Sequence, residues 1–286
     1  MRAQEVIDKA MQFNVSKEAC KQVKAYATRQ YLLKVLTLFP FIGAVVCLFY
    51  DDRQAFWLLM LACLAIIFMY WFGKHLFKRK VVKTLDDACD PEEYCNLIYA
   101  MASYSKRKSS RFVSLWNFTR GLRYWGKLEE MNQVMSVAQE IIETPRDAFF
   151  YHCALCDYAF ETKNLPMLEE FVEAIARQTS GSVNNKRYRN MYESRLLKRD
   201  FLRAEAEENY QQLYQSYTAA ETTSLYVPKA DRIIWSYHRG RLAKVLGSEE
   251  EGRALLQFVV NEGNKLWCVK AALSMGAAPL PGPGNE

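Results

Sequence analysis

The densest group of potential metal ligands in this 286-residue chain is His152, Cys153 and Cys156, in the stretch HCALC. Thiolates and imidazoles bind zinc, and the spacing places both cysteines near one face of a helix. A structural zinc site needs four ligands, usually from a second pair, and Cys89 and Cys95 belong to a different predicted helix. We therefore expect these residues to pack between helices, without a metal or cofactor.

Residues that could perform catalysis are sparse in this sequence. Nucleophile-elbow, phosphate-loop and dinucleotide motifs are absent, and the only histidines are His75, His152 and His238. The carboxylates of LEEMNQ, LEEFVEA and AEAEEN recur at the spacing of a solvated helix face. We predict that the protein is not an enzyme. A cluster of acids or histidines with perturbed pKa values in one pocket would argue against this prediction.

Two apolar runs dominate the N-terminal third of the chain and predict a transmembrane hairpin over 31–72. They cover residues 31–50 and 55–72, and the second has no charged residue. Helices of these lengths reach roughly 27–30 Å, about the thickness of the hydrocarbon core of a bilayer. Aromatic residues gather at the ends of both runs, where a bilayer favours them. The polar residues 51–54 are predicted to form the loop between the two helices.

Basic residues flank the hairpin and predict its orientation. Residues 1–83 hold 13 Lys and Arg against 5 Asp and Glu, a charge of +8, so the remainder of the chain, with 25 against 27, carries −2. Only Arg53 lies in the loop, so the positive-inside rule places both flanks in the cytoplasm. The cations expected at the membrane surface follow the second run: Lys74, Lys78, Arg79 and Lys80. We expect contact with membrane lipids and not with nucleic acid.

The segments next to the hairpin are also predicted to be helical. Residues 1–30 have the pattern of an amphipathic cytoplasmic helix, which could lie on the membrane surface or pack against the cytoplasmic domain. Residues 73–90 are predicted to extend the second apolar helix as a basic juxtamembrane helix. The Pro- and Gly-rich tail, 276–286, is predicted to be disordered.

Residues 91–275 repeat a pattern of helix, short polar break and helix. Helix-start signals stand at Asp90-Pro91 with Glu93, at Thr144-Pro145, at Asn164, and at Ser248 with Glu251. Turns inside successive helix pairs are predicted near Gly126, Lys163, Arg199 and Gly247. These turns are 37, 36 and 48 residues apart. Units of two helices that repeat at about this spacing are typical of a helical solenoid.

Two of these units resemble the tetratricopeptide repeat. In SLWNFTRGLRYWGKLEEMNQVMSVAQEIIETP, Gly126 matches the turn glycine, Ala138 the small residue of the second helix, and Pro145 follows the unit. In GRLAKVLGSEEEGRALLQFVVNEG, Gly240 and Gly247 have the expected separation of seven residues. The resemblance implies an all-α fold in which the hairpin is followed by a tetratricopeptide-like α-solenoid of antiparallel helix pairs.

The resemblance also implies a binding groove, lined by the first helix of each pair. Carried over to this chain, the groove residues are Trp116, Arg120 and Arg123 in the first full unit and Tyr237, Arg241 and Lys244 in the last. Arginine and aromatic residues often dominate binding energies, and Arg pairs well with carboxylates. We therefore expect a protein or peptide partner, and an acidic partner would suit these arginines.

Together these patterns predict an integral membrane protein, of a bacterial plasma membrane, with both termini in the cytoplasm. Its expected role is to bind or scaffold a protein partner at the cytoplasmic face. The alternative is an accessory subunit of a larger membrane complex for transport or secretion, held there by the transmembrane hairpin.

Overall fold

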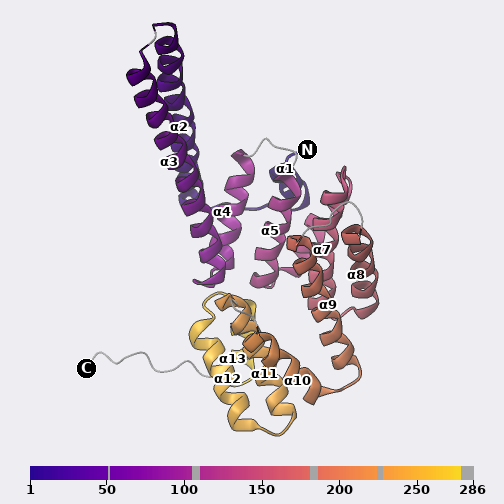
Figure 1. The fold of residues 1–286 in the computed structure, drawn as a ribbon. Helices are drawn as coiled ribbons and strands as arrows, with labels where there is room; N and C mark the ends of the chain where they lie inside the picture. The colour runs from indigo at the N-terminus through magenta and orange to yellow at the C-terminus, as the bar shows by residue number, and fades with distance from the viewer. Residues whose placement is uncertain (51, 105–109, 181–185, 224–227, 278–286) are drawn as a thin grey trace, which may run out of the picture. The chain divides into compact units, whose positions relative to one another are not determined.

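The computed structural model describes residues 1–50, 52–104, 110–180, 186–223 and 228–277. Every regular element in these ranges is a helix, which confirms the predicted all-α class (Figure 1). The chain divides into two units. One, Val15–Lys83, is a helical hairpin, and the other, Met1–Asn14 with Thr84–Glu286, contains the remaining helices. The predicted disordered tail falls mostly on 278–286, outside the described residues.

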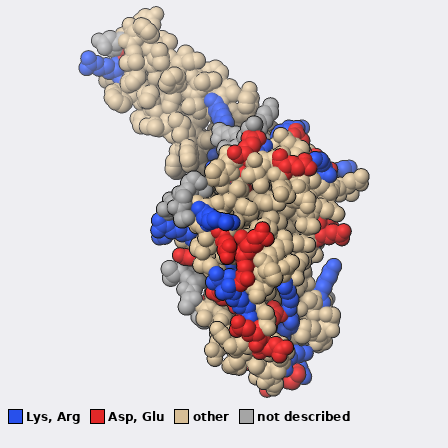
Figure 2. All heavy atoms as spheres, turned by 90° about the vertical axis from the view of Figure 1, so that its right-hand side faces the viewer, with Lys and Arg blue, Asp and Glu red and all other residues tan. Residues whose placement is uncertain are grey.

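Helices α2 (Lys17–Phe49) and α3 (Arg53–Asp86) form the hairpin unit. Both are long and apolar enough to cross a membrane, and only 6% of the most apolar window of each is buried. Their exposed side chains are largely Leu, Phe, Ile, Val and Trp, and Figure 2 shows the uncharged surface that results on one face. Continuous apolar surface of this kind is unfavourable in water and favourable in a bilayer.

The connection between the two helices is shorter than the predicted loop of residues 51–54. Arg53 and Gln54 belong to the first turn of α3, because the Asp52 carboxylate accepts a hydrogen bond from the Ala55 amide at 3.1 Å and caps the helix there. Asp51 lies outside the described residues. Tyr50 follows α2, so the first predicted run is helical up to Phe49.

Helix α3 continues past the second apolar run, as predicted, but it ends at Asp86, before the predicted end at residue 90. Within the hairpin the rings of Tyr26 and Phe77 stack at 4.1 Å, beyond the apolar runs. The predicted membrane-surface cations all lie on this part of α3: Lys74, Lys78, Arg79 and Lys80. Their contact with lipid remains a prediction.

Residues 1–30 do not form the single helix that their pattern indicates. Helix α1 spans Ala3–Ala10, residues 11–16 are not helical, and α2 starts at Lys17. The Ser16 hydroxyl accepts a hydrogen bond from the Ala19 amide at 3.4 Å, which favours a new helix start there. Val6 and Ile7 are fully buried, and α1 contacts α4, α5 and α6. Of the two predicted placements, on the membrane surface or against the other helices, α1 therefore has the second.

The large unit continues with ten further helices among its described residues. In chain order they are α4 (Pro91–Tyr104), α5 (Arg111–Trp125), α6 (Leu128–Gln139), α7 (Pro145–Glu161), α8 (Leu165–Ser180), α9 (Lys186–Ala206), α10 (Tyr210–Thr223), α11 (Lys229–Val245), α12 (Glu249–Glu262) and α13 (Trp267–Ser274). Each of these helices packs against the next one, and α7 also packs against both α5 and α9.

Helices start at all four predicted positions, and at three of them the capping side chain forms a hydrogen bond. Asp90 accepts a hydrogen bond from the Glu93 amide at 3.0 Å, Thr144 and Asp147 cap α7 reciprocally, and Asn164 accepts from Met167 at 3.1 Å. These bonds satisfy amides that have no partner inside the first turn of a helix.

The predicted capping box at Ser248 is wrong. The Ser248 side chain makes no capping hydrogen bond at the start of α12. The carboxylate of Glu251 accepts a hydrogen bond from the Tyr214 hydroxyl of α10 instead. A contact between helices has therefore replaced the local one that the spacing suggested.

Three of the four predicted turns are confirmed by left-handed backbone at Gly126 (φ 80°), Lys163 (φ 57°) and Gly247 (φ 84°). The turn predicted at Arg199 is wrong, because this residue lies within α9. The chain turns at Glu208 (φ 55°) instead. Phe201, which is only 4% exposed, extends the buried face of α9 beyond the predicted end, and burial of this face favours the longer helix.

The beginning and the end of the large unit are in contact. The Tyr124 hydroxyl at the end of α5 donates a hydrogen bond to Asp231 at the start of α11. The Lys265 amide, between α12 and α13, donates to the carbonyl of Cys89 at 3.2 Å. A Cβ atom added to Gly126 would lie 2.8 Å from Cβ of Trp267 in α13. These contacts bring α5 and α11 to the same part of the unit, where the candidate site lies.

Candidate functional site

Four helices of the large unit, α5, α7, α9 and α11, line a cavity of about 180 Å³ with one further residue from α10. A more open groove of about 670 Å³ lies next to it, between α5 and α9. Trp116, Ser194 and Arg195 line both spaces, so the cavity and the groove meet at these three residues.

The three groove residues predicted on α5 all line the cavity: Trp116, Arg120 and Arg123. Their spacing of four and three residues places them on one face of the helix. The Arg120 guanidinium donates to the Asp86 carboxylate at 2.7 Å. The structure therefore brings these three side chains together, while their part in binding a partner remains a prediction.

The three groove residues predicted on α11 do not line the cavity. Tyr237 packs edge-on against Trp267, with ring centroids 5.2 Å apart. The Arg241 guanidinium lies 3.9 Å from Glu205, and the Lys244 ammonium donates to the Met275 carbonyl at 3.2 Å. The cavity is lined by the neighbouring face of α11, with Asp231, Ile234, Trp235 and His238. One residue rotates a helical position by about 100°, so an error of one residue in register selects the wrong face.

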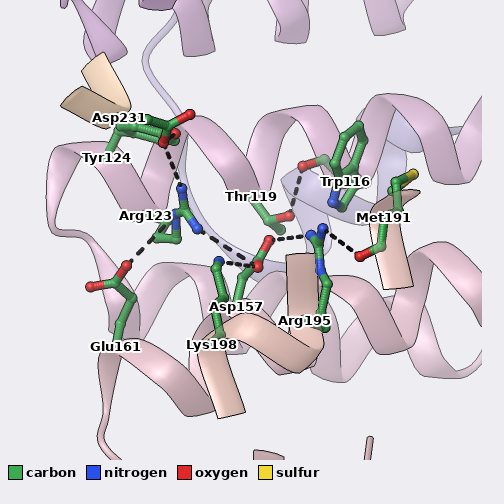
Figure 3. Close-up of polar contacts among 10 residues, drawn as sticks. All are labelled: Trp116, Thr119, Arg123, Tyr124, Asp157, Glu161, Met191, Arg195, Lys198 and Asp231. Carbon is green, nitrogen blue, oxygen red and sulfur yellow. Dashed lines mark hydrogen bonds and ion pairs between the residues drawn. The ribbon is translucent and has the colours of Figure 1, made fainter. Parts of the chain in front are cut away.

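Asp157 of α7 lies at the centre of a buried ion-pair network (Figure 3). Its carboxylate accepts hydrogen bonds from Arg195 at 2.9 Å and from Lys198 at 2.6 Å, both on α9. Sequence reasoning missed these residues. A single acid in the apolar stretch FFYHCALCDYAF was the available signal for Asp157, but its partners lie 38 and 41 residues away and become visible only in the folded chain.

Arg123 is almost completely buried and has three carboxylates around it. Its guanidinium nitrogens lie 3.6 Å from Asp157, 3.8 Å from Glu161 and 3.9 Å from Asp231. These distances allow Coulombic attraction but exceed those of direct hydrogen bonds. The guanidinium also lies over the Tyr124 ring, 4.4 Å from its centroid. Arg123 is therefore held mainly by charge and leaves room for an additional polar group.

Burial and charge perturb several pKa values in this cavity. Burial opposes ionisation of Asp157, but Arg195, Lys198 and Arg123 together hold its pKa well below the usual range. Burial, followed by repulsion from Arg123, lowers the pKa of Lys198 to about 8. Burial raises the pKa of Glu161. These groups are the kind of clustered titratable residues that also mark enzyme sites, although ion-pair networks shift pKa values in the same way.

His238 of α11 lines the same cavity in neutral form. Burial, then Arg241 and Lys163, lowers its pKa to about 3. Its ring stacks on that of Tyr217 at 5.1 Å. A neutral imidazole can accept or donate a hydrogen bond without adding charge to the cavity.

None of the residues singled out as possible metal ligands lines this cavity. Cys153 and Cys156 are fully buried. Burial raises the pKa of the Cys153 thiol to about 12, which favours the protonated form over a metal-binding thiolate. Within the described ranges, no group of three or more His, Cys, Asp or Glu side chains could hold a metal ion.

Comparison with known proteins adds no functional assignment to this geometry. No protein-family model matches the chain, and no curated protein or solved structure matches it. The features that bear on function are therefore the cavity, the adjoining groove and the apolar hairpin.

Proposed function

We propose that this protein is anchored in a membrane by α2 and α3 and binds a protein partner at the cytoplasmic face. The apolar exposed surface of both helices supports the anchor. The basic residues that flank the hairpin support a cytoplasmic location for both ends, by the positive-inside rule. Anchoring would raise the local concentration of partners at the membrane.

The observation that carries the binding role is the cavity joined to an open groove at Trp116, Ser194 and Arg195. A cavity of this size can receive one side chain of a partner, and the wider groove can hold the chain on either side of it. The left-handed turns and the packed helix pairs support a tetratricopeptide-like arrangement, in which α5, α7, α9 and α11 would be the first helices of successive units.

The test compares the full-length protein with a variant whose groove is blocked, both purified from native membranes in mild detergent. Ser194 is exposed where groove and cavity meet, so Ser194→Trp would fill this space. Gln133→Trp is the matched control, on an exposed position of α6, which lines neither space. We expect stoichiometric partners to remain with wild type and with the control and to be lost from Ser194→Trp.

Retention of the same partners by Ser194→Trp would refute the groove. Partners that persist in both variants and disappear only when the hairpin is exchanged for an unrelated one would identify an accessory subunit held by its membrane helices. The comparison therefore separates the proposed function from its main alternative.

Catalysis is a second candidate, because Lys198, with its pKa lowered to about 8, lies in the same cavity as Glu161. Partner binding accounts better for the geometry, since the Lys198 ammonium is occupied by Asp157 at 2.6 Å. A reactive lysine would form an imine with a small aldehyde at pH 8, and borohydride would trap it. We expect no trapping at Lys198. Peptide mapping of the wild type beside Lys198→Arg measures this.

A further inference from the structure

Four buried nitrogen atoms of the cavity lack a hydrogen-bond partner among the described residues. They are Nε1 of Trp116, Nε of Arg123, Nε of Arg195 and Nε2 of His238, and all four side chains line the cavity. A buried donor or acceptor without a partner costs about 1–3 kcal/mol, so native proteins leave few such atoms. Four in one cavity indicate a polar occupant.

The two donors where the cavity meets the groove determine what kind of atom must enter. The other guanidinium nitrogens of Arg195 already donate to Asp157 at 2.9 Å and to the Met191 carbonyl at 3.3 Å, which leaves Nε. The indole nitrogen of Trp116 lies near the end of the Arg195 guanidinium in the view of Figure 3, and both side chains line the groove. Indole and guanidinium N–H groups only donate, so the entering atom must be an acceptor.

The charge balance of the site separates a neutral acceptor from a carboxylate. The cations Arg120, Arg123, Arg195 and Lys198 number four, and so do the anions that contact them: Asp86, Asp157, Glu161 and Asp231. The formal charge is therefore zero before anything enters. A buried carboxylate would add an uncompensated charge, which costs far more than burial of a neutral group that forms hydrogen bonds.

The carboxyl group of Glu161 adds a second requirement. It is nearly buried, and its contact with Arg123 at 3.8 Å is too long for a hydrogen bond. A group that donates as well as accepts would therefore complement the cavity better than an acceptor alone. A primary amide has one acceptor oxygen and two N–H donors, and it carries no charge.

We propose that the cavity receives the neutral side-chain amide of an Asn or Gln residue, carried by an extended segment of the protein partner that lies in the adjoining groove. The proposal rests on the function proposed above. It differs from the acidic partner expected from the sequence, because the arginines of α5 are already matched by carboxylates that only the folded structure brings together.

Propionamide and propionate provide a matched pair of probes, since they have nearly the same shape and differ in charge. Full-length protein with ¹⁵N-labelled tryptophan, in detergent micelles, is titrated with each compound at pH 7, and the indole N–H resonances are followed. The chain has 6 Trp, and the signal of Trp116 is the one that disappears in Trp116→Phe. We expect propionamide to shift this signal with a millimolar dissociation constant, at least about tenfold tighter than propionate.

Two arginine variants on α9 test whether the shift reports the cavity. Arg195→Lys keeps the charge but removes the Nε donor, and we expect it to weaken propionamide binding at least about tenfold. Arg203→Lys is the control, because the Arg203 side chain is 47% exposed and pairs with Glu169 outside the cavity. Binding to this control should equal binding to wild type.

Propionate binding as tight as propionamide binding would overturn the proposal in favour of an acidic anchor. The proposal would also be overturned if neither compound shifted the Trp116 signal at concentrations up to about 200 mM. This concentration is far above the dissociation constant expected for so small a ligand, and ordered water would then satisfy the buried donors. Neither result would affect the loss of partners from Ser194→Trp, so the amide anchor and the proposed function can fail separately.

Discussion

Replacement of Asp157 by Asn should destabilise the large unit strongly. The substitution preserves the shape of the side chain but removes the charge that holds Arg195 at 2.9 Å and Lys198 at 2.6 Å. It also removes the carboxylate 3.6 Å from Arg123. Removing one partner of a buried ion pair costs about 3–5 kcal/mol, because the other charge stays buried. At about 2–4 °C per kcal/mol for a unit of this size, the melting temperature should fall by roughly 6–20 °C.

The assay is thermal unfolding of the full-length protein in detergent, followed by near-ultraviolet circular dichroism. Glu169→Gln is the control, since it removes one acid from an exposed ion pair with Arg203 and should cost about 1 kcal/mol or less. Asp157→Asn combined with Lys198→Met restores the balance of charge and should recover at least half of the lost stability. An effect of Asp157→Asn as small as that of Glu169→Gln, or a double variant no more stable than the single one, would refute the charge argument.

Two further predictions concern a turn and a histidine. Gly126→Ala should destabilise the protein by more than the roughly 1 kcal/mol expected for Ala at positive φ, because its Cβ would lie 2.8 Å from Trp267. Gly247→Ala is the control, since it has the same backbone strain but no neighbour within 4 Å. Equal losses of stability in thermal unfolding of the two variants would contradict this prediction. His238→Gln should reduce the loss of stability in acid. The folded pKa of His238, about 3, lies below its ordinary 6.5, so the unfolded chain binds the proton first and stability falls as pH drops from 6.5 towards 3. Between pH 6.5 and 5 wild type should lose about 1.5–2 kcal/mol more than the variant, and parallel pH profiles of the melting temperature would be inconsistent with this assignment.

Local signals in the sequence predicted local structure well. Thr144 and Asp147 determine the start of α7 through their own hydrogen bonds, and Gly126 determines the end of α5 through its backbone angle. The apolar runs predicted α2 and α3 because hydrophobic length is itself a local property. At Ser248 a helix starts as predicted but without the expected capping hydrogen bond, and at Arg199 the predicted turn is absent because the residue lies within α9.

The candidate site was only partly predictable, for a related reason. Trp116, Arg120 and Arg123 share a helix face, so their spacing was sufficient to group them. The anions that neutralise these arginines come from α3, α7 and α11, and no periodicity within one helix can pair them. Only the tertiary structure therefore distinguishes a cavity of balanced charge from a basic groove. The expected chemistry of the partner depends on the same information.

The contact between α5 and α11 has a consequence for the biosynthesis of this protein. Tyr124 and Asp231 are 107 residues apart, and the pairing of Asn264 with Ala88 spans 176 residues. On the ribosome, α2 and α3 emerge before α11 has been translated. The last wall of the cavity is therefore added after both helices of the apolar hairpin have been synthesised. Because sequence-distant contacts complete the cavity, its formation should be a late and comparatively slow step, and a nascent chain that ends before α11 cannot form the complete site.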